Sequence, residues 1–282
     1  MTRSDRPARL PPGGGAADVP GVVAEFPRVD VLGVGISAIR MADALARIEA
    51  WIATGDRQYV CVVPAHTVMD CCSDPELRAI VNAGGLVTPD GMSLVWLLRA
   101  GNYRHTERVY GPDLMLAVCR RSPEAGWRHF FLGGEEGVAA ELAARLERQF
   151  PGLAVAGTLS PPYRDLSAEE DAALCEAVNA SRPDVVWIGL GSPKQERWMA
   201  AHREALTAPV LIGVGAAFDF LSGRRRQAPR WIQRSGLEWL YRLASEPRRL
   251  WRRYIRYPRF VFLVLRQAAE ARHRAATGPG GV

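Results

Sequence analysis

The feature that most restricts the fold of this chain is a regular alternation of short apolar segments with amphipathic ones. Apolar segments predict short buried strands at residues 31–34, 59–63, 86–88, 129–132, 154–158, 185–190 and 210–214. Helical spacing or helix start signals mark segments 38–54, 74–83, 92–99, 167–180 and 193–202, and a further helix follows Gly134 as far as about Gln149. Ser167 and Glu170 have the spacing of a capping box. Strands alternating with helices predict an α/β protein, with a parallel sheet covered by helices on both faces.

The alternation stops near Gly223, where the charge of the chain also changes. Residues 1–223 carry 21 basic and 27 acidic side chains, a net charge of −6, whereas residues 224–282 carry 15 arginines and three acids, a net charge of +12. Such asymmetry suggests a polyanionic partner, either a membrane surface or a nucleic acid. We therefore divide the chain into a Pro-, Gly- and Ala-rich segment expected to be disordered, a core, a basic aromatic helical appendage and a tail, at residues 1–20, 21–223, 224–265 and 266–282.

Composition excludes several classes of protein. No stretch of about 18 apolar residues is present, so we expect no transmembrane helix, and the N-terminus lacks the apolar core of a signal peptide. Five scattered cysteines without a CxxC spacing suggest reduced thiols in a cytoplasmic protein. The five histidines show no metal-binding spacing and no DxD pair follows a strand, so we expect neither a metal nor a cofactor.

Four predicted strand ends carry Gly or Asp, at residues 88–91, 131–134, 188–196 and 213–219. In parallel α/β sheets, ligands bind at the carboxyl ends of strands. Glycine there lets the backbone approach a phosphate, and the next helix N-terminus favours its charge, although glycine also serves ordinary tight turns. A dinucleotide fingerprint is absent, because Lys194 stands where the third glycine of GxGxxG would fall.

Four side chains at or near these ends have a functional interpretation and an ordinary one. Asp90 could be a general base for a sugar hydroxyl or a helix N-cap. Lys194, the only lysine, could bind phosphate or lie on the surface, and His66 could be a base or a structural residue. Arg108 could pair with a phosphate or with a neighbour such as Glu107.

These residues lie in ordered blocks through which the chain resembles the WecG/TagA/CpsF family of bacterial glycosyltransferases, from about residue 31 to 262. The blocks are Pro-Asp-Gly at 89–91, Glu-Arg-Val-Tyr-Gly-Pro-Asp-Leu at 107–114, Gly-Leu-Gly-Ser-Pro-Lys-Gln-Glu at 189–196, Gly-Ala-Ala-Phe-Asp-Phe-Leu-Ser-Gly at 215–223, Ala-Pro at 228–229, Gly-Leu-Glu-Trp-Leu-Tyr-Arg-Leu at 236–243 and Glu-Pro-Arg-Arg at 246–249.

The resemblance implies a Rossmann-like core and transfer from a UDP-sugar to a polyprenyl-diphosphate-linked acceptor, with inversion and without a metal. It implies that Asp90 is the base, that Arg108 belongs to the diphosphate site, and that Gln195 and Asp219 face the nucleotide. We expect further substrate contacts from the same blocks, from the segment after the second strand and from the glycine-bearing strand end at 131–134, namely His66, Thr67, Gly133, Gly134, Gly191, Lys194, Glu196 and Phe218.

The chain departs from the family pattern after the second predicted strand. Many members carry Thr-x-Asn-Ala-Glu there, whereas this chain reads Val-Val-Pro-Ala-His-Thr at 62–67, with His66 in the place of Glu. That segment is expected to touch the sugar or the acceptor. A donor sugar other than N-acetylmannosamine, such as glucose in exopolysaccharide synthesis, is therefore a plausible alternative.

The arginine-rich segment is expected to dock on the inner face of the plasma membrane. Four arginines, at 249, 252, 253 and 256, share one helical face, and apolar and aromatic side chains largely share another. This pattern suits a basic interfacial helix, although a solvated face packed on the body would have it too. Arg242, Arg249, Arg252 and Arg253 are the expected contacts with the membrane or the diphosphate. A nicotinamide-dependent oxidoreductase and a nucleic-acid-binding protein are the rival functions, and self-association is a further alternative.

Overall fold

The computed structural model describes residues 25–277, so the segment 1–20 that we expect to be disordered lies outside the described residues. Its centre is a parallel sheet of six strands in the order β4-β3-β8-β7-β5-β6. The strands are β3 (Gln58–Val63), β4 (Leu86–Pro89), β5 (Arg128–Gly133), β6 (Ala154–Leu159), β7 (Val185–Gly189) and β8 (Val210–Gly213). The sheet confirms the predicted Rossmann-like α/β class.

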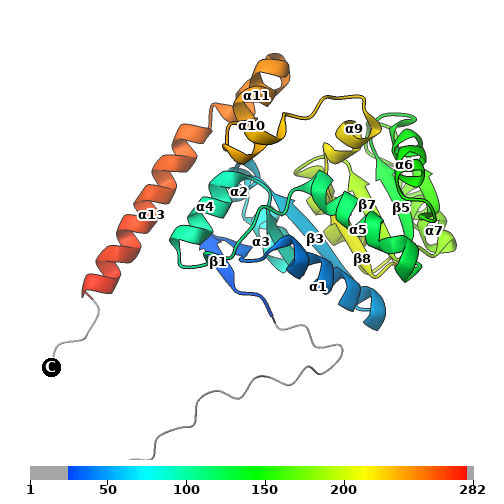
Figure 1. The fold of residues 1–282 in the computed structure, drawn as a ribbon, viewed down its shortest axis with the longest axis horizontal. Helices are drawn as coiled ribbons and strands as arrows, with labels where there is room; N and C mark the ends of the chain where they lie inside the picture. Colours follow the sequence, from blue (N-terminus) through cyan, green and yellow to red (C-terminus); the bar gives the residue numbers. More distant parts are fainter. Residues whose placement is uncertain (1–24, 278–282) are drawn as a thin grey trace, which may run out of the picture.

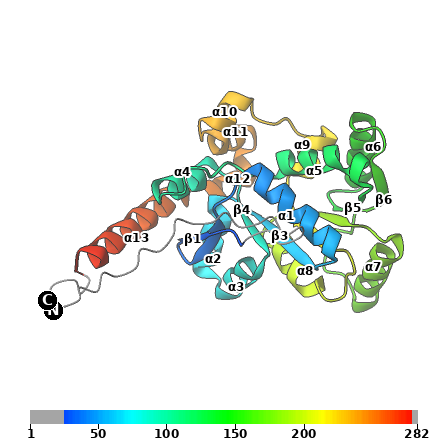
Figure 2. The same ribbon diagram turned by 60° about the horizontal axis from the view of Figure 1, so that its bottom comes forward.

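Helices cover both faces of this sheet (Figures 1 and 2). One face carries α1 (Met41–Thr54), α5 (Gly111–Ala125), α6 (Val138–Gln149) and α9 (Ala217–Ser222). The other carries α2 (Ala65–Ser73), α3 (Pro75–Ala83), α7 (Ala168–Ser181) and α8 (Lys194–His202), with α4 (Met92–Ala100) beside β4. Alternate strand residues feed the two cores: Phe131 and Trp187 enter one, and Leu132 and Ile188 the other.

Three local predictions need comment. The expected strand at 31–34 is instead a hairpin of β1 (Arg28–Val31) and β2 (Val34–Ser37), because Leu32 and Gly33 adopt positive φ and reverse the chain. Helices α2 and α5 were not anticipated, since their apolar residues are interrupted by Pro, Gly and polar residues. The capping box is confirmed: Glu170 N–H donates to Ser167 Oγ (3.2 Å), and Ser167 N–H donates to a Glu170 oxygen (2.9 Å).

The arginine-rich segment forms a helical appendage, as predicted. It contains α10 (Arg230–Arg234), α11 (Glu238–Ser245), α12 (Pro247–Tyr254) and α13 (Tyr257–Thr277), and α13 extends away from the sheet in both views (Figures 1 and 2). The expected single basic helical face is divided between α12 and α13, and the boundary drawn at residue 265 falls inside α13. Within residues 25–277, none of the helices is both long and apolar enough to cross a membrane.

The appendage joins the body through a close contact. Gly236, between α10 and α11, has φ +76° and lies against the ring of Trp96 on α4. A Cβ atom at position 236 would be 2.4 Å from Trp96 Cη2, so a side chain there would require movement of the ring or the backbone. Farther along, Leu250 and Phe260 are buried, and Arg256 pairs with Asp70 of α2.

Candidate active site

Asp90 directly follows β4, at the carboxyl edge of the sheet. Its carboxylate accepts a hydrogen bond from the backbone N–H of Gly111 at 3.3 Å. Gly91, not Asp90, is the N-cap residue of α4, so the ordinary N-cap interpretation of Asp90 does not hold. The pKa of the Asp90 carboxyl is raised to about 6, chiefly by burial and also by nearby Glu238, whereas Arg108 acts in the opposite direction. A carboxylate with such a pKa is ionised at neutral pH and is a stronger base than an exposed aspartate.

Arg108 lies against Asp90, and its partners are not those of a surface arginine. Its Nε donates to the backbone carbonyl of Asp90, and its Nη2 donates to Glu238 of α11 at 2.6 Å. The guanidinium carbon lies 3.9 Å from the centre of the Tyr110 ring. The Tyr110 hydroxyl donates to the other oxygen of Glu238 at 3.1 Å. No ion pair with Glu107 forms, so the structure brings Arg108 into the site.

Glu238 is the residue of this site that sequence reasoning missed. The signal was present, because Glu238 is one of only two acids between Arg224 and Phe262. The side chains of Arg108 and Glu238 expose only 15% and 13% of their surfaces, so the pair is well shielded from water.

The appendage brings three arginines near the same edge. Arg242 influences the pKa of Asp90 directly, and its guanidinium lies 5.4 Å from the ring centre of Phe220. The buried Nε of Arg242 has no hydrogen-bond partner among the described residues. Arg225 pairs with Asp219 at 3.0 Å. Burial and the nearby Arg225 and Arg242 lower the pKa of Arg249, and Asp219 opposes this. Positive charge therefore extends from the end of β8 toward Asp90.

The glycines predicted to bind phosphate lie where β5 and β7 end. Gly133, Gly134 and Gly191 have φ of +125°, +75° and +78°, and Gly134 N–H donates to the Gly189 carbonyl at 3.2 Å. Phe218 is 1% exposed and packs so closely on Gly189 that a Cβ there would be 2.6 Å from its ring. The structure therefore places Phe218 in the core behind these turns, where it supports the backbone.

Gln195 and Glu196 lie beneath the glycine turns. Gln195 Nε2 donates to Glu196 at 3.1 Å, and the buried Gln195 Oε1 has no hydrogen-bond partner among the described residues. Burial raises the pKa of the Glu196 carboxyl. Across the β3 end, Thr67 Oγ1 and Ser192 Oγ are 3.1 Å apart, and His66 is 7% exposed at the start of α2. These polar side chains meet at the ends of the neighbouring strands β3, β8 and β7.

Lys194 borders a cavity of about 410 Å³ next to the glycine turns. Leu132 and Leu190, at the ends of β5 and β7, line its floor, and Trp198 lines one wall. Lys194 Nζ lies 6.0 Å from the ring centre of Tyr163, which is fully exposed. The position of Lys194 is thus consistent with either of its two interpretations, a ligand contact or an exposed lysine.

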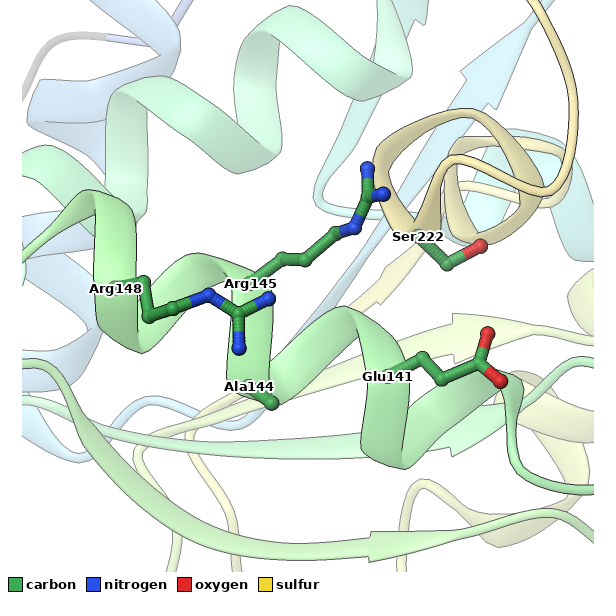
Figure 3. Close-up of a pocket in the computed structure, with 5 residues that line it drawn as sticks. All are labelled: Glu141, Ala144, Arg145, Arg148 and Ser222. Atoms are coloured by element: carbon green, nitrogen blue, oxygen red, sulfur yellow. The ribbon is translucent and has the colours of Figure 1, made fainter.

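Two features lie apart from Asp90. Arg252 lies over the exposed Trp251 ring at 5.5 Å, and the side chain of Arg253 lies outside the described residues. A second hollow, of about 270 Å³, lies between α6 and α9, where Arg145 points toward Ser222 (Figure 3). Asp90 follows β4, whereas α6 follows β5, and three strands, β3, β8 and β7, lie between β4 and β5 in the sheet. Among residues 25–277 no group of three or more His, Cys, Asp or Glu side chains is placed to hold a metal.

Comparison with known proteins gives one consistent result. A family model described as "Glycosyl transferase WecG/TagA/CpsF family" matches residues 29–274. An N-acetylglucosaminyldiphosphoundecaprenol N-acetyl-beta-D-mannosaminyltransferase of Bacillus spizizenii is 32% identical over 197 residues, 70% of this chain and 74% of the relative. A protein of the same name from Bacillus subtilis is 28% identical over 194 residues, 69% of this chain and 73% of the relative. The chain therefore belongs to the WecG/TagA/CpsF family of glycosyl transferases.

Proposed function

We propose that this protein transfers a sugar from a UDP-sugar donor to a polyprenyl-diphosphate-linked acceptor, with inversion and without a metal, in exopolysaccharide or cell-envelope polysaccharide synthesis. Family membership supports glycosyl transfer, and the two Bacillus relatives are named for an undecaprenyl-diphosphate-linked acceptor. The observation that carries the proposal is the half-buried Asp90 carboxylate with its raised pKa, set beside Arg108 at the carboxyl edge of the sheet.

Asp90 would act as the general base. Its carboxylate would take the proton of the acceptor hydroxyl as that oxygen attacks the anomeric carbon from the face opposite the diphosphate. The new glycosidic bond forms while the bond from the anomeric carbon to the diphosphate oxygen breaks, and UDP leaves with the negative charge. Direct displacement of this kind inverts the anomeric configuration. A pKa of about 6 suits the task, because the base is ionised at neutral pH and still takes a proton efficiently.

The departing diphosphate needs positive charge, which this chain can supply from arginine. Arg108 and Arg242 act on the Asp90 carboxyl, and Arg225 and Arg249 lie near Arg242 and Asp219. Fixed cations that face the leaving group in a shielded site stabilise the transition state strongly. The unpartnered Nε of Arg242 and the unpartnered Oε1 of Gln195 are suited to contact the diphosphate and the nucleoside. The cavity beside Lys194 would hold another part of the donor.

The appendage would place this site on the anionic inner face of the plasma membrane. Its exposed large apolar side chains are Trp231, Leu237, Leu240, Trp251, Ile255, Val261, Phe262 and Leu265. Arginines are interleaved with them, and each arginine near an anionic surface contributes about 1 kcal/mol of binding. An apolar surface edged with arginine is suited to lie in the headgroup region, close to a lipid-linked acceptor.

Product analysis tests this function. The full chain would be incubated with a panel of UDP-sugars and a short-chain lipid-diphosphate-sugar, with and without excess EDTA. We expect one preferred UDP-sugar, an inverted anomeric product and full activity in EDTA. The panel also separates N-acetylmannosamine, the sugar named for the relatives, from the glucose alternative suggested by His66. Loss of activity in EDTA that Mg²⁺ or Mn²⁺ restores would contradict metal independence, and absence of any product would contradict the transferase.

A further inference from the structure

Glu238 brings a carboxylate from outside the sheet into the candidate site. It is the first residue of α11, and its two oxygens accept hydrogen bonds from Arg108 Nη2 and the Tyr110 hydroxyl. Those two donors are two residues apart in the chain, 130 and 128 residues before Glu238. Gln227 Nε2 also donates to the Tyr110 hydroxyl at 3.3 Å, so a second appendage residue supports the same network.

The orientation of Arg108 depends on this contact. One edge of its guanidinium is held by the Asp90 backbone carbonyl, one face lies on the Tyr110 ring, and Glu238 holds the far nitrogen. Among residues 25–277, Glu238 is the acidic side chain that forms an ion pair with the guanidinium, so without it Arg108 could rotate about its long side chain. An arginine held by a carboxylate is a better-ordered donor than a free one, because less conformational freedom remains to be lost.

The charges around Asp90 also depend on Glu238. The groups that act on the Asp90 carboxyl are Arg108 and Arg242, which are positive, and Glu238, which is negative. Two tyrosines also lie near these groups. The phenol of Tyr254 interacts electrostatically with Arg242, and the phenol of Tyr257 interacts with both Asp90 and Arg242. Glu238 is the only like charge in this group and the partner of the nearest cation. It therefore offsets a pair of arginines that would otherwise weaken Asp90 as a base.

We propose that Glu238 is a positioning residue through which the docked appendage orients Arg108 and keeps Asp90 strongly basic. The inference rests on the proposed role of Asp90 as the general base. It means that the core alone does not contain the complete site: part of the basicity of Asp90 depends on Glu238 of α11 being docked against Arg108 and Tyr110. A purely structural ion pair would hold α11 in place but would leave the titration of Asp90 unaltered.

The test compares the full-length wild type with Glu238→Gln, a substitution that keeps the shape of the side chain and removes its charge. The turnover number would be measured at saturating donor between about pH 5 and pH 9. We expect the acidic limb of the wild-type profile, near pH 6, to move down by about one pH unit and the plateau to fall about tenfold. Glu49→Gln, which removes one acid of an exposed ion pair on α1, is the matched control and should keep both quantities.

Two further variants make the outcome unambiguous. Glu238→Asp keeps the charge but shortens the reach, so the acidic limb should stay near that of the wild type while the plateau falls. Asp90→Asn examines the base itself. Carboxyl NMR of ¹³C-aspartate-labelled protein measures the titration of Asp90 independently of turnover. The spectrum of Asp90→Asn identifies the Asp90 signal. In Glu238→Gln, the pKa obtained from this signal should shift downward as the acidic limb does.

An unchanged limb and an unchanged carboxyl titration in Glu238→Gln would overturn this inference even if Asp90→Asn is inactive. Activity retained in Asp90→Asn would instead overturn the proposed base. Should Glu238→Gln not fold, Tyr110→Phe removes one of the two donors that hold Glu238, and its profile decides the question: a lower plateau at unchanged melting temperature supports the positioning role, and a wild-type profile contradicts it.

Discussion

In the sheet, Phe131 and Trp187 are completely buried, whereas in the appendage Trp231 and Phe262 expose 69% and 64% of their surfaces. The body is stabilised by two continuous apolar cores. The appendage is joined to it by a few buried anchors such as Leu250 and by ion pairs that reach across to the body. Both regions meet at Asp90. The comparison teaches that the base is placed by the stable region, whereas the charges around it come largely from the more weakly attached one.

The largest effect is expected at the residue that belongs to the stable region. Asp90→Asn keeps the shape of the side chain but removes its basicity, so turnover should fall on the order of 10²-fold or more with donor binding largely kept. Steady-state kinetics and donor titration measure the two quantities. Asp56→Asn, on the exposed turn before β3, is the control and should behave as the wild type. Near wild-type turnover in a folded Asp90→Asn protein would show that the base lies elsewhere.

An arginine of the appendage should matter nearly as much. Arg242→Ala removes a cation whose buried Nε has no partner among the described residues, and we expect kcat/KM to fall on the order of 10- to 100-fold. A water-soluble acceptor separates this effect from membrane binding. Arg248→Ala, an exposed arginine of α12, supplies the comparison. Equal kinetics in the two variants would show that Arg242 takes no part in the reaction.

The core has a pH dependence of its own, which does not involve the appendage. His129 is buried; its Nδ1 accepts from Trp187 Nε1 (3.0 Å), so its Nε2 carries the hydrogen and donates to Ser122 Oγ (2.7 Å). Burial lowers the pKa of His129 to about 3. Below about pH 6.5, His129 therefore binds a proton in the unfolded chain but stays neutral in the folded chain, so stability is lost as the pH falls below that value.

Denaturant unfolding at pH 7 and pH 5 measures this loss. Between those two values the wild type should lose about 2 kcal/mol more than His129→Gln, whose side chain does not titrate. The comparison between the two proteins cancels the carboxylates that both contain. An identical pH dependence would mean that the buried hydrogen-bond chain accommodates the imidazolium.

The smallest effect concerns the exposed surface of the appendage. Phe262→Ser should weaken binding to anionic vesicles by about tenfold, since the side chain would no longer enter the headgroup region. Sedimentation with vesicles measures it, and neutral vesicles report the share that depends on charge. Turnover of a water-soluble acceptor should stay at the wild-type level, which shows that the site is intact. Unchanged vesicle binding would move the docking surface away from α13.

Prediction from the sequence succeeded where the signal was local. The strands of the parallel sheet were predicted from apolar runs, four of which, β4, β5, β7 and β8, end at or next to Gly or Asp, and each of those signals lies within about ten residues. The prediction of a single strand at 31–34 was wrong, because two short strands joined by a tight turn have the same apolar composition as one strand. Helix α2 was not predicted because His66, Thr67 and Asp70 interrupt its apolar pattern. In the structure, the polar side chains of His66 and Thr67 belong to the buried face of this helix.

The site shows the same division. Asp90 and Arg108 stand in local blocks and lie together in the structure. Glu238 was missed because a single acid among arginines looks like part of a solvated face, and only the docking of α11 shows that it is shielded. Phe218 was expected to touch substrate but packs behind Gly189, because a residue next to a site in sequence can support its backbone from the core. Contacts between distant segments depend on tertiary packing, which spacing along the chain does not record.

The fit of Gly236 against Trp96 has a consequence for how such a protein could be altered. The joint has no room for a methyl group unless the Trp96 ring or the backbone moves, and a backbone shift there would draw Glu238 away from Arg108 while every residue of the chemistry remained in the sequence. Activity would then be lost through a change in the orientation of α11, although none of the reactive groups had been substituted. Chimeric enzymes that exchange appendages between relatives should accordingly keep this glycine and the indole it faces as one exchangeable unit.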